Sequence, residues 1–379
     1  MTTKEITIST ARYIAALLVA LNKGGELPEK PGEVEYRRVF ALAKRHSVAS
    51  AIWYVIEDEV RATGDDELIS RFIRECDLAY AQNLVQTREF AAVCDAFTKA
   101  GIRFLPIKGF INKALWLKPE YRTMSDMDIF VSPDTAEAAA EALKSIGYVF
   151  DHGGSVHDSY VKPPYVNIEL HKSLGSYGDG DFNSWVPTES NPYHFVMRDE
   201  DYLVYLLDHM YKHYKSGGNG MRSFFDLYLF QGAKGASLDK AYIEGELRWR
   251  GLDEFYSLAN RLSALWFGGE SACSDELIEL EYYIITGGTF GTVENRVEHA
   301  LKTRSRFGYL LSRIFLPYSS MKGIYPWLKP LPFLLPIAWV MRLLKALFDG
   351  RMRRELRATN NASRLKRNSA SPSTTDTEQ

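Results

Sequence analysis

Cysteine is scarce in this sequence. Its 379 residues include only three, Cys76, Cys94 and Cys273, and their spacing matches neither a metal-binding nor a redox motif. An odd number of cysteines without such a motif excludes the disulfide frameworks that small secreted domains use. The sequence therefore predicts a reduced, cytoplasmic protein.

Apolar runs long enough to cross a membrane are also missing. The strongest candidate, LPFLLPIAWVM at 331–341, has eleven residues, two of them prolines, whereas a spanning helix needs about 20. The run YIAALLVAL near the N-terminus follows Glu5 and lacks a cleavage site, so we expect no signal peptide. Its apolar residues instead follow helical spacing, which predicts a packed helix capped by Ser9 or Thr10 and ended by Gly24.

The sequence carries little net charge, formally −2, but its charges are unevenly distributed. Between 301 and 367 there are 15 lysines and arginines and only two acidic residues, a local balance of +13, whereas residues 1–300 carry −13. A basic segment of this kind indicates an anionic partner. The alternatives are an anionic membrane surface, RNA, or the acidic remainder of the same chain.

The patterning changes along the chain, and 46% of the residues are hydrophobic, enough for a sizeable core. Five ranges are expected: an N-terminal helical region (1–100), an α/β core (101–174), a helical region (175–300), a basic aromatic region (301–360) and a disordered tail (361–379). The third range is expected to begin with a loop over 176–200. The expected fold class is α/β (α+β), with a small mixed-sheet domain flanked by helical regions on both sides.

Within the expected core, strand and helix patterns alternate. Strands are expected at IRFLPI, MDIFV and GYVF, and a hairpin at SYVK and YVNIELHK. Helices are expected at INKALWL and DTAEAAAEALKSI, the second with Asp134 as its cap. This alternation over ~75 residues predicts a compact unit around a mixed sheet.

Two aspartates stand at the head of one expected strand, in YRTMSDMDIFV. Residues i and i+2 of a strand face the same side, so the side chains of Asp126 and Asp128 project together. Two ionised carboxylates placed this way are costly unless a cation lies between them. Oxygen ligands with room for water and phosphate suit Mg²⁺, with Mn²⁺ as an alternative.

Further residues of the right type surround this pair. The alternation of VNIELHK puts Glu169 and His171 on one face, and a third carboxylate allows two metal ions to be held ~3.5–4 Å apart for displacement at phosphorus. Upstream, the IKGF turn offers backbone N–H groups to a phosphate, and Lys108 and Arg122 add positive charge. Each feature alone fits a plain turn or a solvated strand end, whereas the ordered combination favours catalysis.

These residues carry a family resemblance. The sequence resembles the bacterial family of uncharacterised nucleotidyltransferases, within the DNA polymerase beta-like nucleotidyltransferase superfamily. The shared features are a Lys-Gly turn, an arginine before an Asp-x-Asp strand, a Gly-Tyr after the next helix and a later Glu-Leu-His, here Lys108-Gly109, Arg122 with Asp126 and Asp128, Gly147-Tyr148, and Glu169-Leu170-His171. One departure is the turn, which is usually Gly-Gly or Gly-Ser in the wider superfamily.

The resemblance implies roles for these positions. Divalent metal ions would be held by three carboxylates: Asp126, Asp128 and Glu169. Glu169 would either ligate a metal or help to deprotonate the acceptor. The expected nucleotide-binding residues are Lys108, Gly109, Arg122 and Ser125. Three more residues are expected beside the site or in contact with the substrate: His171, His213 and Asp226.

A pair of histidines offers a competing metal site. His209 and His213 lie four residues apart on a helix expected from Asp199, which is compatible with zinc binding. No glutamate or third histidine completes a zinc motif there, so a surface or domain-facing position is the expectation.

Together these features predict an enzyme, a Mg²⁺-dependent nucleotidyltransferase that transfers a nucleoside monophosphate from an NTP such as ATP to an acceptor hydroxyl or phosphate. It is expected in the cytoplasm, and peripherally at the membrane if the basic region binds lipid. Two alternatives remain open: a catalytically inactive binding protein with the same fold, and an RNA-directed nucleotidyltransferase.

Overall fold

The computed structural model describes residues 1–154, 156–164, 166–175, 182–271, 274–348, 354 and 357–360. The chain forms two compact units, Met1–Lys212 with Asn219–Thr289, and His213–Gly218 with Phe290–Gln379. Cys273 and the tail expected at 361–379 lie outside the described residues. Among the helices that are described, none has the length and apolar character needed to cross a membrane.

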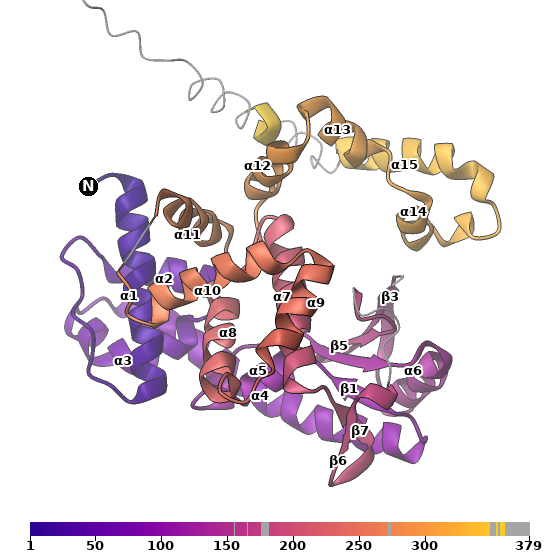
Figure 1. The fold of residues 1–379 in the computed structure, drawn as a ribbon, viewed down its shortest axis with the longest axis horizontal. Helices are drawn as coiled ribbons and strands as arrows, with labels where there is room; N and C mark the ends of the chain where they lie inside the picture. The colour runs from indigo at the N-terminus through magenta and orange to yellow at the C-terminus, as the bar shows by residue number, and fades with distance from the viewer. Residues whose placement is uncertain are drawn as a thin grey trace, which may run out of the picture. The chain divides into compact units, whose positions relative to one another are not determined.

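Four helices precede the sheet in the first unit (Figure 1): α1 (Thr3–Lys23), α2 (Tyr36–Arg45), α3 (Ala49–Ala62) and α4 (Asp66–Lys99). Helix α1 buries the apolar face that its spacing predicted. The predicted cap at Ser9 or Thr10 is wrong, because Thr2 and Glu5 form a reciprocal capping box further upstream. The predicted end is confirmed, with Gly24 in the left-handed conformation.

The first unit contains a seven-stranded mixed sheet. In chain order its strands are β1 (Phe104–Pro106), β2 (Met127–Val131), β3 (Val149–Gly153), β4 (His157–Lys162), β5 (Val166–His171), β6 (Val186–Thr188) and β7 (Asn191–Val196). Across the sheet the order is β3-β4-β5-β2-β1-β7-β6. Strand β2 pairs with β5, and β1 with β7, in parallel, and the other neighbours are antiparallel. The expected α/β class and the β4–β5 hairpin are confirmed.

The structure corrects three local expectations. Strands β6 and β7 lie within 176–200, which was expected to be a loop, because pairing with β1 from far along the chain overrides the Gly- and Pro-rich composition. Asp134 does not cap α6 (Ala136–Ser145), since Pro133 starts a 3₁₀ turn that leaves Thr135 at the cap position. Helix α5 (Gly109–Lys113) is only five residues long and begins earlier than INKALWL.

The two faces of the sheet differ in their side chains. On one face, Met127, Ile129 and Val131 of β2 join a buried apolar core with side chains of α4 and α6. The residue between them, Asp128, points to the opposite face, and so does Glu169 of β5. This alternation carries the polar residues of two neighbouring strands to one side of the sheet.

More helices follow the sheet in the sequence. In the first unit they are α7 (Asp199–Lys215, whose last residues fall in the second unit), α8 (Met221–Lys234), α9 (Lys240–Arg250), α10 (Asp253–Phe267) and α11 (Asp275–Gly287). In the second unit they are α12 (Val293–Thr303), α13 (Arg306–Ile314), α14 (Tyr318–Ile324) and α15 (Leu335–Phe348). The tyrosines Tyr202 and Tyr205 of α7 are buried, as expected of packing residues.

Candidate active site

The strand register brings the three predicted carboxylates together. Asp128 and Glu169 are paired positions on the parallel strands β2 and β5, and Asp126 directly precedes β2. One ligand oxygen from each of the three lies within 4.8 Å of the others. Asp128 is only 4% exposed, whereas Asp126 and Glu169 are half-buried. The cluster thus lies on the sheet, and two of its three carboxylates are partly exposed to solvent.

Two basic side chains contact the most buried of these carboxylates. Lys108 Nζ donates to Asp128 Oδ1 at 2.6 Å, and His171 Nε2 lies 2.8 Å from the same oxygen. His171 Nε2 also lies 3.4 Å from Glu169 Oε2. One oxygen atom of Asp128 therefore contacts both Lys108 of the predicted turn and His171 of β5.

The three carboxylates differ in proton affinity. Burial, and then the charge of Asp128, raise the pKa of Asp126 to about 6. Burial acts in the same direction on Asp128, but the Lys108 ammonium and His171 outweigh it and lower its pKa below the ordinary value. Burial also acts to raise the pKa of Glu169, but the hydrogen bond with His171 and the charges of His157 and Lys108 together outweigh it, and the pKa is lowered. Of the three, Asp126 is the carboxylate for which the described residues provide no ion pair, although the charge of Lys108 partly offsets the rise.

The Lys-Gly turn has a strained backbone. Lys108 has a φ of 54°, in the left-handed region that favours glycine. This is the position where the wider superfamily usually has glycine, so the departure noted in the sequence has a conformational cost. Gly109 passes so close to Met124 that an added Cβ would lie 2.1 Å from its Sδ. Backbone strain of this kind persists where the surrounding structure imposes it, most often at functional sites.

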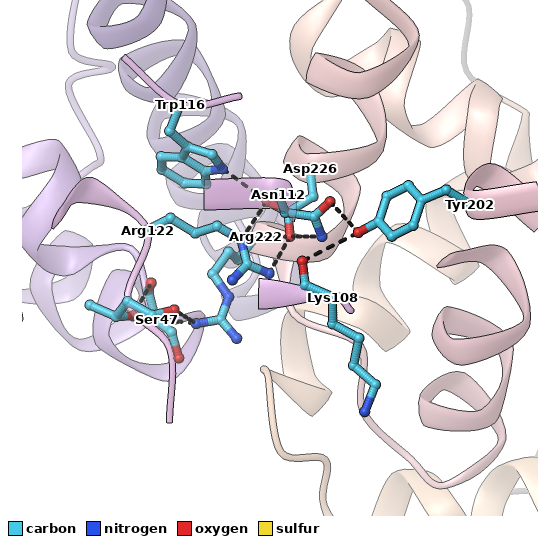
Figure 2. Close-up of polar contacts among 9 residues, drawn as sticks. Ser47, Lys108, Asn112, Trp116, Arg122, Tyr202, Arg222 and Asp226 are labelled. Atoms are coloured by element: carbon cyan, nitrogen blue, oxygen red, sulfur yellow. Dashed lines mark hydrogen bonds and ion pairs between the residues drawn. The ribbon is translucent and has the colours of Figure 1, made fainter. Parts of the chain in front are cut away.

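Arg122 is paired with the buried carboxylate of Asp226 (Figure 2). Its side chain is 7% exposed, and Nη2 donates to Asp226 Oδ2 at 2.7 Å. Its Nε donates to the two oxygens of Asp226 at 2.9 and 3.1 Å. Asp226 accepts two more hydrogen bonds, from Asn112 at 3.2 Å and Trp116 at 2.8 Å. A buried carboxylate thus occupies Nε and Nη2 of Arg122, and its contact with a triphosphate stays a prediction.

The segment 122–124, which leads to the carboxylates, is held by distant helices. Arg222 of α8 donates through Nη1 to the carbonyl and hydroxyl oxygens of Thr123. Gln86 of α4 donates to the carbonyl oxygen of Met124 at 2.7 Å. Burial, and then a neighbouring guanidinium, lower the pKa of Arg222 to about 10. Two helices thus fix the entry of the chain into β2.

Two residues of this neighbourhood, His157 and Arg222, were not predicted. His157 of β4 pairs with His171 across the β4–β5 ladder, and its Nε2 lies 3.6 Å from Glu169 Oε1. The alternation of VHDSYVK carried that signal, because the hairpin register puts both histidines on the face of Glu169. For Arg222, at the start of α8, no local pattern points to the site.

The remaining predicted residues lie in different places. Ser125 is exposed, and its Oγ donates to Asp126 Oδ1 at 2.5 Å. It also lines a cavity of about 430 Å³ together with Asn167 of β5. His213, on α7, falls in the second unit, and its role beside the site stays a prediction. Neither it nor His209 belongs to a potential metal-binding group among the described residues, which gives the zinc alternative no support.

Comparisons with known proteins add to this geometry. The family model described as "Uncharacterised nucleotidyltransferase" matches residues 32–268, more than half of the chain. A search of curated protein sequences gives no match. One similar solved structure is titled "Solution Structure of Antibiotic-Resistance Factor ANT(2'')-Ia Reveals Substrate-Regulated Conformation Dynamics". It covers 46% of this chain and 98% of its own, with 8% identity and a TM-score of 0.35, a likeness too weak to carry an argument.

Proposed function

Since the chain belongs to the uncharacterised nucleotidyltransferase family, we propose that it is a Mg²⁺-dependent enzyme that transfers a nucleoside monophosphate from an NTP to an acceptor hydroxyl or phosphate. The observation that supports this activity best is the cluster of Asp126, Asp128 and Glu169, with ligand oxygens within 4.8 Å of one another. Nucleotidyl transfer needs positive charge held rigidly at phosphorus. Three carboxylates on neighbouring strands can hold the divalent cations that supply this charge.

The donor set fits hard divalent cations. All three carboxylates offer oxygen, which Mg²⁺ and Mn²⁺ prefer. Burial and the charge of Asp128 raise the pKa of Asp126 to about 6, and a bound cation would favour its ionised form. When bound, the metal would supply Lewis-acid stabilisation of phosphate charge. Asp126 and Asp128 would hold it, and Glu169 would either hold it as well or help to take a proton from an acceptor.

Nucleotide binding is proposed on the same face of the sheet. Lys108 Nζ lies 2.6 Å from Asp128 Oδ1. Its positive charge would attract the triphosphate to the neighbourhood of the carboxylates. Asn167, which lines a cavity together with Ser125, lies two residues before Glu169 on β5 and therefore on the same face of that strand. The volume of this cavity, about 430 Å³, falls within the range of ordinary ligand pockets, and we propose that it receives the nucleoside.

Mg²⁺-dependent binding of ATP is the first test of this proposal. Calorimetric titration should show binding in the presence of Mg²⁺ and much weaker binding after chelation, because without the metal the negative carboxylates would repel the triphosphate. With α-labelled NTPs, label should pass to an acceptor in a cell extract. Metal-dependent binding without transfer would favour the inactive binding protein. No ATP binding at all would exclude both the proposed enzyme and that binding protein.

The second proposal is that the basic region binds an anionic membrane surface. Four residues of α15 follow an i, i+3, i+4, i+7 spacing and are 53%, 57%, 45% and 51% exposed: Ile337, Val340, Met341 and Leu344. They form an apolar stripe within a segment of charge +13. An exposed apolar stripe among basic residues favours an interfacial helix over RNA binding, for which basic residues alone suffice.

Vesicle sedimentation tests this partner. The full chain should bind vesicles that contain phosphatidylglycerol and not vesicles of phosphatidylcholine alone. Val340→Glu with Leu344→Glu should abolish that binding, and Leu84→Glu should preserve it, since Leu84 is 61% exposed on α4. Equal binding by the α15 variant would contradict the proposal. Salt-sensitive RNA binding without vesicle binding would instead favour the RNA-directed enzyme.

A further inference from the structure

We propose that His157, Glu169 and His171 form a second cation site, selective for Zn²⁺ over Mg²⁺, next to the three carboxylates. Its part in catalysis rests on the proposed nucleotidyl transfer, but binding of the ion does not. Glu169 belongs to both groups of ligands, so the two sites would share one carboxylate.

The hairpin register creates this group. His157 and His171 are paired positions on the antiparallel strands β4 and β5, and Glu169 lies two residues before His171 on the same face. The Nε2 atom of His157 lies 3.6 Å from Glu169 Oε1, and that of His171 lies 3.4 Å from Glu169 Oε2. One ligand atom from each of the three residues lies within 4.8 Å of the others. Such separations suit donors about 2.0–2.2 Å from a shared ion.

The ligand chemistry distinguishes this site from the carboxylate site. Mg²⁺ takes oxygen ligands and retains water, so the three carboxylates suit it. Two imidazole nitrogens and one carboxylate instead suit zinc and its first-row neighbours. The side chain of His157 is 32% exposed and that of Glu169 is 21% exposed, which leaves a path for an ion and free positions for water or phosphate.

A hydrogen bond accounts for the position of His171 but not for that of His157. His171 Nε2 is 2.8 Å from Asp128 Oδ1, a normal hydrogen bond, which this nitrogen would give up on binding the ion. His157 Nε2, at 3.6 Å from Glu169 Oε1, is too far for one, although its ring faces the same carboxylate and lies 5.1 Å from the ring of His171. A cation between them accounts for both the approach and the separation.

Metal titration of the full-length protein tests the site without nucleotide. The protein is stripped with a chelator, and Zn²⁺ or Mn²⁺ is added in millimolar Mg²⁺ while binding is followed by calorimetry. We expect tight Zn²⁺ binding by the wild type. His157→Ala should weaken it by more than the ~10–100-fold that loss of an outer-shell partner costs. The matched control is His152→Ala, since the side chain of His152 is 66% exposed on β3 and, among the described residues, forms an ion pair with its neighbour Asp151 alone.

The outcomes separate this proposal from the proposed function. Unchanged Zn²⁺ affinity in His157→Ala, with the fold intact by circular dichroism, would overturn it and leave the histidines as partners of the carboxylates. Loss of Zn²⁺ binding in Asp126→Asn but not in His157→Ala would also overturn it, because the ion would then lie at the carboxylates. Failure of the proposed transfer would appear instead as absent Mg²⁺-dependent ATP binding, which this titration does not measure.

Discussion

Asp128→Asn should abolish Mg²⁺-dependent ATP binding and lower nucleotidyl transfer by about 10³-fold or more. The substitution removes a negative charge from the most buried of the three carboxylates, where the divalent ion needs it. Metal stabilisation of phosphate charge contributes several kcal/mol, and each ~1.4 kcal/mol changes a rate tenfold. Calorimetric ATP titration and a labelled-NTP assay measure the two effects.

The control for this variant is Asp134→Asn, an aspartate that is exposed in a 3₁₀ turn and contacts no site residue among those described. It should bind and transfer as the wild type does. The Asp128→Asn protein should stay folded, because its amide oxygen can still accept from Lys108 and one of three crowded charges is gone. Full ATP binding and transfer by a folded Asp128→Asn protein would rule out the proposed metal role.

Asp226→Asn should lower the free energy of unfolding by about 3–5 kcal/mol. Asp226 is 1% exposed and Arg122 is 7% exposed, so the neutral amide would leave a guanidinium buried without its counter-charge. The same carboxylate also accepts from Asn112 and Trp116, so the loss extends to a network of hydrogen bonds. Urea unfolding followed by circular dichroism measures it.

Two further variants make this second prediction specific. Asp199→Asn breaks a surface pair with Lys234, whose atoms are 3.1 Å apart, and should cost no more than about 1 kcal/mol. Arg122→Met combined with Asp226→Leu removes both charges and should recover much of the stability, since an apolar pair can replace a buried ion pair. A loss below about 1 kcal/mol in Asp226→Asn would mean that Arg122 finds another partner.

Local sequence patterns were sufficient to predict the carboxylate cluster. The i, i+2 spacing assigned Asp126 and Asp128 to one face, and the alternation in VNIELHK did the same for Glu169 and His171, while the other face of each strand had to be buried. Register is strongly specified when one face is apolar, so the two strands pair with Asp128 and Glu169 opposite each other. The helical face of α1 and the β4–β5 hairpin were predictable for the same reason.

The sequence by itself therefore determined the mixed-sheet fold, the family and the meeting of Asp126, Asp128 and Glu169. Only the tertiary structure decided what the basic residues contact. Arg122 lies 104 positions before Asp226, and nothing in the local pattern distinguishes an arginine that meets phosphate from one that meets a buried aspartate. Periodicity encodes which side of an element is buried, whereas the partner found there depends on which elements pack together.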